Sequence, residues 1–450
     1  MMWKLRSAAY EPHNFEYSDD AGVTMSQRRS AGNPIGGIVV VTVQYRLGFL
    51  GFLNVKNLLP DVLQITTNFD SNVGAHDVLL ALNWVKKNIE SFGGDPDAIT
   101  VAGHSAGASI ASCLYLSGKA DGLISRLILA SGTSESAFDG SWGYRDVSAK
   151  LIKSATYTDI HAKNLTQSEL DEVESYMEYR EIDDVLEHFD QKNFLGWPLV
   201  VDGELFEDVP RVMAENLNST QNSSKPLEVF LGVTRDEWAA FELKLMLDGV
   251  KALDPAIYNW RMVVKFVSKI LAFAYPRNEI TSKMRKMVDG YGFSAMNPNV
   301  SSWVETTIDV LTDAFFASRA IREALYYQKL GANVYLYEFT QPASSFLIDG
   351  YKPVLHGDDL SLLFGRKGGM AGREMARLWT DFVRGIAPAT EPLDTSRWNY
   401  VEIDDEGVTE RRDFRRNART LWGLRDAPLY IDFPKEALEK AWQHPTVTLF

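Results

Sequence analysis

Residues 98–116 read AITVAGHSAGASIASCLYL: a short apolar run, a glycine-flanked serine and a helix-like apolar stretch. The pentapeptide at 103–107 has the form Gly-x-Ser-x-Gly, with Ser105 at its centre. Between a strand and a helix, such a turn projects the serine hydroxyl from the carboxyl edge of a parallel sheet. The backbone N–H of Ala106, at the start of the helix, then faces a developing oxyanion. The stretch therefore predicts an α/β fold with Ser105 as a nucleophile.

On either side of this turn, apolar segments of strand length alternate with helical patterns. The expected strands lie at 38–45, 98–102, 127–130, 229–233 and 334–338. Such alternation is typical of a mostly parallel sheet flanked by helices. The β-branched run at 38–45 has no polar alternation, which predicts a strand buried on both faces of that sheet.

The remaining segments are predicted to be helical or irregular. Helical patterns cover 77–92, 146–190 and much of 236–330, and Gly93 and Gly94 stop the first of them. The tail from Thr390 is expected to be rich in loops. Its arginine cluster is expected to be a solvated surface and contains Arg411, Arg412, Arg415, Arg416 and Arg419. No repeat or low-complexity linker interrupts the chain, which predicts a single domain.

The composition limits the partners. The chain has 450 residues, a formal charge of -14 and a pI near 5.1. Surfaces that bind nucleic acid or anionic membranes favour clustered Lys and Arg, so this charge argues against both partners. The single cysteine, Cys113, excludes an intrachain disulfide, and its apolar neighbours predict a buried thiol. Residues 1–30 lack the apolar stretch of a signal peptide, and no apolar run is long enough to span a membrane.

A nucleophilic serine needs a base to accept its proton and a carboxylate to orient that base. In α/β folds with this turn, the chain order is serine, acid, histidine. Only His356 and His444 follow a suitable acid, and His444 lies close to the terminus. His356 follows the expected strand at 334–338 and is therefore the predicted base. His104, beside the serine, is predicted to line the pocket.

The acid is expected directly after the strand at 229–233. Asp236 and Glu237 are both candidates there, and their position alone does not choose between them.

The chain resembles the type-B carboxylesterase/cholinesterase family from about residue 36 to residue 400. The matching stretches are VTVQYRLGFLGFL, ALNWVKKNIESFGGDPDAITVAGHSAGAS, LILASG, PLVVDGELF, LGVTRDEW, VYLYEF, LHGDDLSLLFG and ARLWTDFVRG. The resemblance implies an α/β-hydrolase domain over 36–450, after an atypical segment at 1–35. It also implies the hydrolysis of small carboxylic esters through an acyl-enzyme, with no metal and no cofactor.

The resemblance also implies residue roles. It selects Glu237 as the acid, with Trp238 in place of the glycine that usually follows, a change expected to crowd the loop. Ser131 matches a serine that supports the triad from the second shell. Independently of the resemblance, Trp197 is predicted either to border the acyl pocket or to be a core aromatic.

The N-terminal region departs from the family pattern. A His-Gly-Gly-Gly-type loop, which supplies oxyanion-hole N–H groups in the family, is absent, and His13 and Asn14 stand at two of the glycine positions. Lys4 and Arg6 would be costly to bury in a central strand. The sequence therefore predicts an N-terminally truncated member with an open sheet edge.

Two expectations follow from this departure. The alternative to an active esterase is a catalytically impaired or non-catalytic member that acts in partner binding or adhesion. The chain also contains sequons, which point to a secreted or ER-lumenal full-length parent and begin at Asn164, Asn218, Asn222 and Asn299.

Overall fold

The structure is a computed structural model that describes residues 37–54, 70–138, 166–179, 197–217, 226–241, 258–275, 277–292, 300–348, 350–364 and 369–422. Its strands are β1 (Thr100–His104), β2 (Arg126–Ala130), β3 (Glu228–Thr234), β4 (Asn333–Phe339), β5 (Tyr400–Asp404) and β6 (Gly407–Arg411). The helices before β4 are α2 (Phe49–Phe52), α3 (Val73–Asn88), η3 (Ile89–Phe92), α4 (Ala106–Leu116), α5 (Ser134–Ala137), α7 (Gln167–Tyr179), α9 (Pro210–Asn216), α11 (Trp260–Ala274), α12 (Arg277–Tyr291), α13 (Val300–Thr312), η6 (Asp313–Ala317) and α14 (Ser318–Lys329). Those after β4 are α15 (Asp358–Leu363), α16 (Gly369–Val383) and α17 (Arg416–Leu421).

The strands form one sheet in the order β1-β2-β3-β4-β5-β6. The first five run parallel, and β6 pairs antiparallel with β5. In a parallel sheet the carboxyl ends of neighbouring strands meet at one edge, where ligands bind in open α/β folds. The loops after β1, β3 and β4 therefore meet at that edge, and these are the loops with the predicted serine, acid and histidine.

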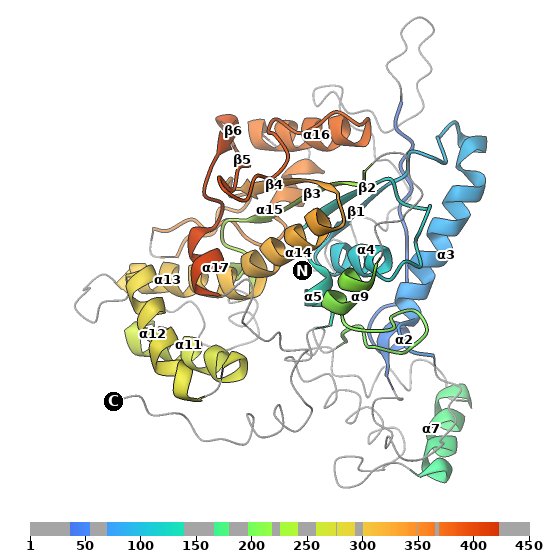
Figure 1. Ribbon diagram of the computed structural model, residues 1–450, viewed down its shortest axis with the longest axis horizontal. Coiled ribbons are helices and arrows are strands. Elements are labelled where there is room, and N and C mark those ends of the chain that lie inside the picture. The colour runs from blue at the N-terminus through green and yellow to red at the C-terminus, as the bar shows by residue number, and fades with distance from the viewer. Residues whose placement is uncertain are drawn as a thin grey trace, which may run out of the picture.

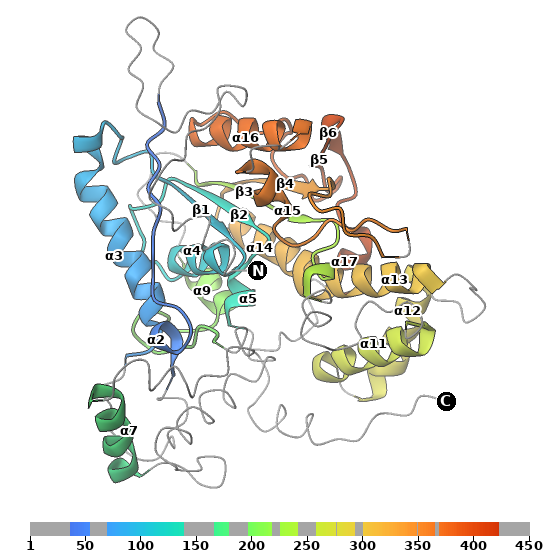
Figure 2. The same ribbon diagram turned by 180° about the vertical axis from the view of Figure 1, so that it is seen from behind.

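Both faces of the central strands β2, β3 and β4 are covered, which explains why these strands lack polar alternation. In β2, Leu127 and Leu129 pack into a core with α4 and α14, whereas Ile128 and Ala130 pack into a second core with α16. Figures 1 and 2 show α16 on one side of the sheet and α4 and α14 on the other. A third core joins α11, α12 and α13 beside the sheet.

Most of the expected elements are present. The strands expected at 98–102, 127–130, 229–233 and 334–338 correspond to β1 to β4. The helix expected at 77–92 is α3 followed by the 3-10 turn η3, and it ends at Gly93, whose φ is 83°. Cys113 is fully buried, as its neighbours indicated. Of the helical region expected at 146–190, α7 lies within the described residues.

Two expectations about the fold were wrong. Residues 38–45 form no strand: the segment pairs with no strand of the sheet, and Val40 is 46% exposed. The apolar side chains of this segment favour burial. A strand also needs a hydrogen-bonded neighbour, however, and local sequence does not specify that neighbour. Within the described residues, β1 is therefore an edge strand. The tail expected to be rich in loops contributes β5, β6 and α17.

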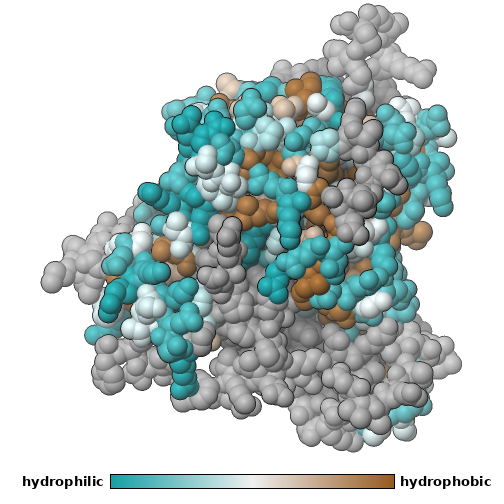
Figure 3. Space-filling model, viewed as in Figure 1, coloured by the Kyte–Doolittle hydropathy of each residue, from teal (hydrophilic) through white to brown (hydrophobic). Residues whose placement is uncertain are grey.

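The described surface in Figure 3 is mostly hydrophilic, with smaller hydrophobic areas between the polar ones. No helix in the described parts of the chain has the length and apolar character needed to cross a membrane. The four sequon asparagines, and the segment 1–35, lie outside the described residues.

Candidate active site

Ser105 occupies the turn between β1 and α4. Its φ of 55° and ψ of -124° lie in a region that non-glycine residues rarely adopt, a strain typical of functional turns. The Ser105 N–H donates to the carbonyl of Ala130 at 2.8 Å, and its carbonyl accepts from Ser109 N–H at 3.0 Å. These bonds tie the turn to β2 on one side and to the first turn of α4 on the other.

Two glycines make this turn possible. A Cβ at Gly103 would lie 2.4 Å from the backbone nitrogen of Ala108, so only glycine lets β1 and α4 approach so closely. A Cβ at Gly132 would lie 2.1 Å from the carbonyl oxygen of Ser105. Gly107 differs, because a Cβ there would meet no atom within 4 Å apart from its chain neighbours and the backbone of its own helix.

His356 and Glu237 are in direct contact. His356 Nδ1 lies 2.5 Å from Glu237 Oε2, and the Glu237 side chain is fully buried. Glu237 Oε1 accepts a hydrogen bond of 2.7 Å from the backbone N–H of Thr234. Both carboxylate oxygens therefore have partners: Oε1 bonds to the backbone of its own loop, and Oε2 bonds to the imidazole.

Asp236, the other candidate acid, faces away from the imidazole. Its carboxylate accepts from the Tyr351 hydroxyl at 2.5 Å and from the Val354 N–H at 2.8 Å. The two adjacent carboxylates thus bond to different partners, and only Glu237 is hydrogen-bonded to His356.

The His356 ring also lies beside the serine turn. It lies 4.6 Å from the ring of His104, the residue before Ser105. His104 Nε2 is buried and has no hydrogen-bond partner among the described residues. Burial, together with the neighbouring His356, holds the pKa of His104 well below its usual value. His104 is therefore neutral at pH 7 and packs against His356 as an uncharged ring.

Two aromatic side chains that were not predicted from the sequence also lie beside His356. Phe316 and Phe241 lie 5.3 Å and 5.7 Å from the imidazole, centroid to centroid. Phe241 comes four residues after Glu237, and residues at this spacing share one face of a helical segment, so the sequence did contain a signal for it. Phe316 is presented by the π-helical turn η6, and such turns occur frequently at functional sites.

Trp238 fits the acid loop by stacking rather than by crowding it. Its ring stacks at 26° on Phe241 and on Phe315, at 5.3 Å and 4.9 Å. The backbone N–H of Trp238 donates to Thr312 Oγ1 at 3.1 Å. Trp238, Phe241 and Phe316 thus form an aromatic wall beside His356.

The structure places the other predicted site residues as follows. Ala106 begins α4 and is exposed, so its N–H lies at the free end of the helix. Ser131 is buried with a φ of 53°, its hydroxyl makes no hydrogen bond within the described residues, and its support of the triad stays a prediction. Trp197 is half-buried, and its place at the acyl pocket stays a prediction. His13 and Asn14 lie outside the described residues.

A buried carboxyl lies behind the serine helix. Glu323, on α14, accepts hydrogen bonds from the hydroxyls of Ser112 and Ser134, the latter at 2.6 Å. Ser112 lies on α4, and Ser134 begins α5 shortly after Gly132. Glu323 thus joins three helices around the turn. Burial raises its pKa to about 7, and Glu135 adds to that rise.

We expect Glu323 to make the stability of the protein depend on pH. Because its folded pKa of about 7 exceeds the ordinary value of 4.5, the unfolded chain ionises first and stability falls as the pH rises between these values. Urea unfolding of the wild type and Glu323→Gln from pH 5 to pH 8 should show the wild type losing about 2 kcal/mol relative to the variant. Parallel pH dependences would contradict the assignment, since all other titrating groups are common to both proteins.

The expectation of a solvated arginine cluster was wrong for Arg415. Its side chain is 9% exposed and pairs with Glu338 at 2.7 Å and Asp313 at 3.4 Å. It also donates to the carbonyls of Thr234 and Arg235, which start the acid loop. Arg415 thus anchors this loop from behind.

The sequence profile described as the carboxylesterase family matches residues 19–422. The chain belongs to the carboxylesterase family. Membership implies the α/β-hydrolase fold, which the mostly parallel, doubly covered sheet confirms.

Curated members of the family are similar at modest identity. Mouse neuroligin-3 is 27% identical over 73% of this chain and 37% of its own length. Bovine carboxylesterase 4A is 28% identical over 82% of this chain and 66% of its own length. Acetylcholinesterase of Bungarus fasciatus is 25% identical over 86% of this chain and 63% of its own length. The chain spans less than two thirds of the length of each of these relatives.

Proposed function

We propose that this carboxylesterase-family chain hydrolyses carboxylic esters through an acyl-enzyme on Ser105. The observation that carries the proposal is the 2.5 Å contact between His356 and Glu237, beside the strained turn of Ser105. A buried carboxylate that holds one imidazole nitrogen leaves the other to accept a serine proton. The order serine, glutamate, histidine along the chain agrees with α/β-hydrolases.

Each residue would have a defined step. His356 removes the proton from Ser105, whose oxygen attacks the ester carbonyl and forms a tetrahedral intermediate. The negative oxygen is stabilised by the N–H of Ala106 and by the N-terminus of α4. The imidazolium then protonates the leaving alcohol, and water repeats both steps on the acyl-enzyme. Glu237 orients the imidazole and stabilises its charged form.

The aromatic wall of Phe241, Phe316 and Trp238 supports an apolar ester group next to His356. Within the described residues, no cluster of three or more His, Cys, Asp or Glu side chains is arranged to hold a metal ion.

A fluorophosphonate probe tests the proposal, because it reacts with serines activated as nucleophiles. We expect stoichiometric labelling of the native wild type, with the adduct on the peptide that contains Ser105, and none after heat denaturation. Absence of labelling in the folded wild type would overturn the proposed function.

The alternative is a non-catalytic member that binds a partner. The sequence feature that favours it is the presence of His13 and Asn14 where the family resemblance implies glycines. Losing one oxyanion donor lowers the rate by about 10²–10³. An impaired enzyme would therefore still label slowly at Ser105, whereas a partner-binding member without an activated serine would not label at all.

A further inference from the structure

The loop that carries His356 is held by its own set of contacts, separate from the contact with Glu237. Tyr351 OH and Val354 N–H donate to the two oxygens of Asp236, at 2.5 Å and 2.8 Å. The Asp236 N–H in turn donates to the Val354 carbonyl at 3.2 Å. Asp236 is 4% exposed, so these bonds are largely shielded from water. The loop is thus joined to the residue directly before Glu237.

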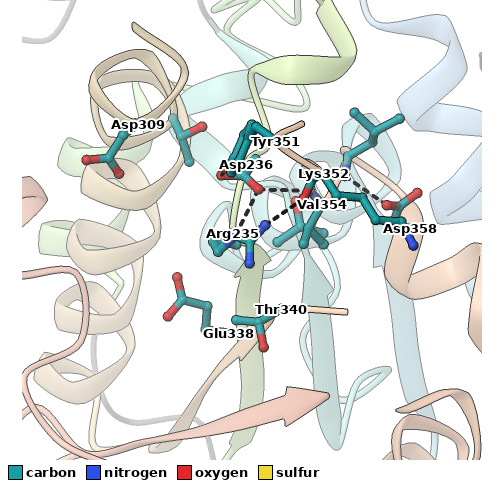
Figure 4. Close-up of polar contacts among 12 residues, drawn as sticks. Arg235, Asp236, Asp309, Glu338, Thr340, Tyr351, Lys352, Val354 and Asp358 are labelled. Atoms are coloured by element: carbon teal, nitrogen blue, oxygen red, sulfur yellow. Dashed lines mark hydrogen bonds and ion pairs between the residues drawn. The ribbon is translucent and has the colours of Figure 1, made fainter. Parts of the chain in front are cut away.

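Arg235 extends this connection. Its Nε pairs with Asp236 Oδ2 at 2.9 Å, and its terminal nitrogen donates to the Lys352 carbonyl at 2.9 Å. Figure 4 shows Arg235, Asp236, Lys352 and Val354 joined across the gap between the two loops. Two adjacent residues of the acid loop, Arg235 and Asp236, therefore bind three positions of the histidine loop within four residues.

The far end of the histidine loop is fixed by a different carboxylate. Asp358 Oδ2 accepts from Leu355 N–H at 2.9 Å and from Ala343 N–H at 3.1 Å. His356 is therefore flanked by two anchors, and only the one at Asp236 reaches the loop that supplies Glu237.

We propose that Asp236 is a positioning residue, whose carboxylate holds the His356 loop in register with Glu237. It touches neither Ser105 nor the imidazole, and acts by fixing the backbone from Tyr351 to Val354. The two adjacent acidic residues then divide the work: Glu237 binds the imidazole, and Asp236 binds the loop that carries it. The inference rests on the proposed function only for its kinetic readout.

Two substitutions separate the position of the loop from the charge of Asp236. Asp236→Asn removes the charge but keeps a side chain of the same shape that can bond to the Val354 N–H. Asp236→Ala removes all the side-chain bonds. Because misplacement of a catalytic group by about 1 Å costs about 100-fold, we expect kcat/KM to fall about 100-fold in Asp236→Ala and less than about 10-fold in Asp236→Asn.

Asp394 provides a control that is matched in its kinds of hydrogen-bond partner, although its side chain is 38% exposed against 6% for Asp236. Like Asp236, it accepts from a backbone N–H, a hydroxyl and an arginine, here Ser396 N–H, Ser396 OH and Arg397 Nε. It lies at the opposite end of the sheet, because the adjacent Leu393 N–H bonds to Val334 near the start of β4. Asp394→Ala should therefore change kcat/KM by less than about twofold.

A proton resonance tests the inference without any turnover. The proton between His356 Nδ1 and Glu237 should give a downfield NMR signal that is absent from His356→Gln. We expect this signal to persist in Asp236→Asn and Asp394→Ala, and to be broadened or lost in folded Asp236→Ala. If Asp236→Ala keeps both the signal and the rate, or if Asp236→Asn loses as much as Asp236→Ala, the positioning role is wrong. If the wild type proves inactive, the proposed function fails while the NMR comparison still decides this inference.

Discussion

Replacing Ser105 with alanine is expected to lower kcat/KM for p-nitrophenyl butyrate by about 10⁶, because the substitution removes the hydroxyl on which the proposed acyl-enzyme forms. Loss of the nucleophile in serine hydrolases has an effect of this order, and the residual rate comes from binding and the oxyanion site. Alanine is smaller than serine and introduces no clash into the turn, whose close backbone approaches lie at Gly103 and Gly132. The folded structure should therefore be retained.

The control for this prediction is Ser117→Ala. Ser117 lies at the other end of the same helix, where its hydroxyl donates to the Leu114 carbonyl at 3.0 Å. Its replacement should leave the rate within about twofold of the wild type. Equal rates for the wild type and Ser105→Ala would show that any observed hydrolysis arises elsewhere.

Replacing His356 with glutamine is expected to lower kcat/KM by about 10⁵ or more, since a serine without its base is almost unreactive at pH 7. Glutamine approximates the shape of the side chain and can still donate to Glu237, so the loop should remain in place. Labelling by the fluorophosphonate should slow to a comparable extent. Steady-state rates and labelling rates, measured on the same preparations, check this prediction.

His76→Gln is the matched histidine control. His76 is half-buried on α3, within the same domain but outside the proposed triad. Its replacement should leave both rates unchanged. A loss of less than about tenfold in His356→Gln would mean that His356 is not the base.

Local sequence predicted the centre of the sheet well, because buried parallel strands are short apolar runs with recognisable turns. The strands β1 to β4 and the helices α3 and α4 were all expected. Residues 38–45 show the limit of this reasoning: their apolar run is as strong as that of β3, yet strand formation depends on a neighbouring strand that local sequence does not specify. Strands β5 and β6 were missed because their alternation is short and partly exposed.

At the site, the sequence led to the positions of the serine, acid and histidine loops through chain order and family resemblance. It did not resolve how Asp236 and Glu237 divide their contacts, because adjacent side chains diverge according to the tertiary structure. It also missed Phe316, which depends on a π-helical turn, and the burial of Arg415. An arginine run near acidic residues reads as a solvated surface, and only the fold shows that one member lies beneath the acid loop.

The most direct test of the esterase assignment is the mass of the protein during turnover of p-nitrophenyl acetate. Rapid acid quenching should trap one acetyl group per molecule, and peptide mapping should place it on the peptide that contains Ser105. The amplitude of the p-nitrophenol burst should equal the amount of acetylated protein. Turnover without an acetyl adduct, or an adduct at another residue that forms and decays at the rate of turnover, would contradict the acyl-enzyme on Ser105.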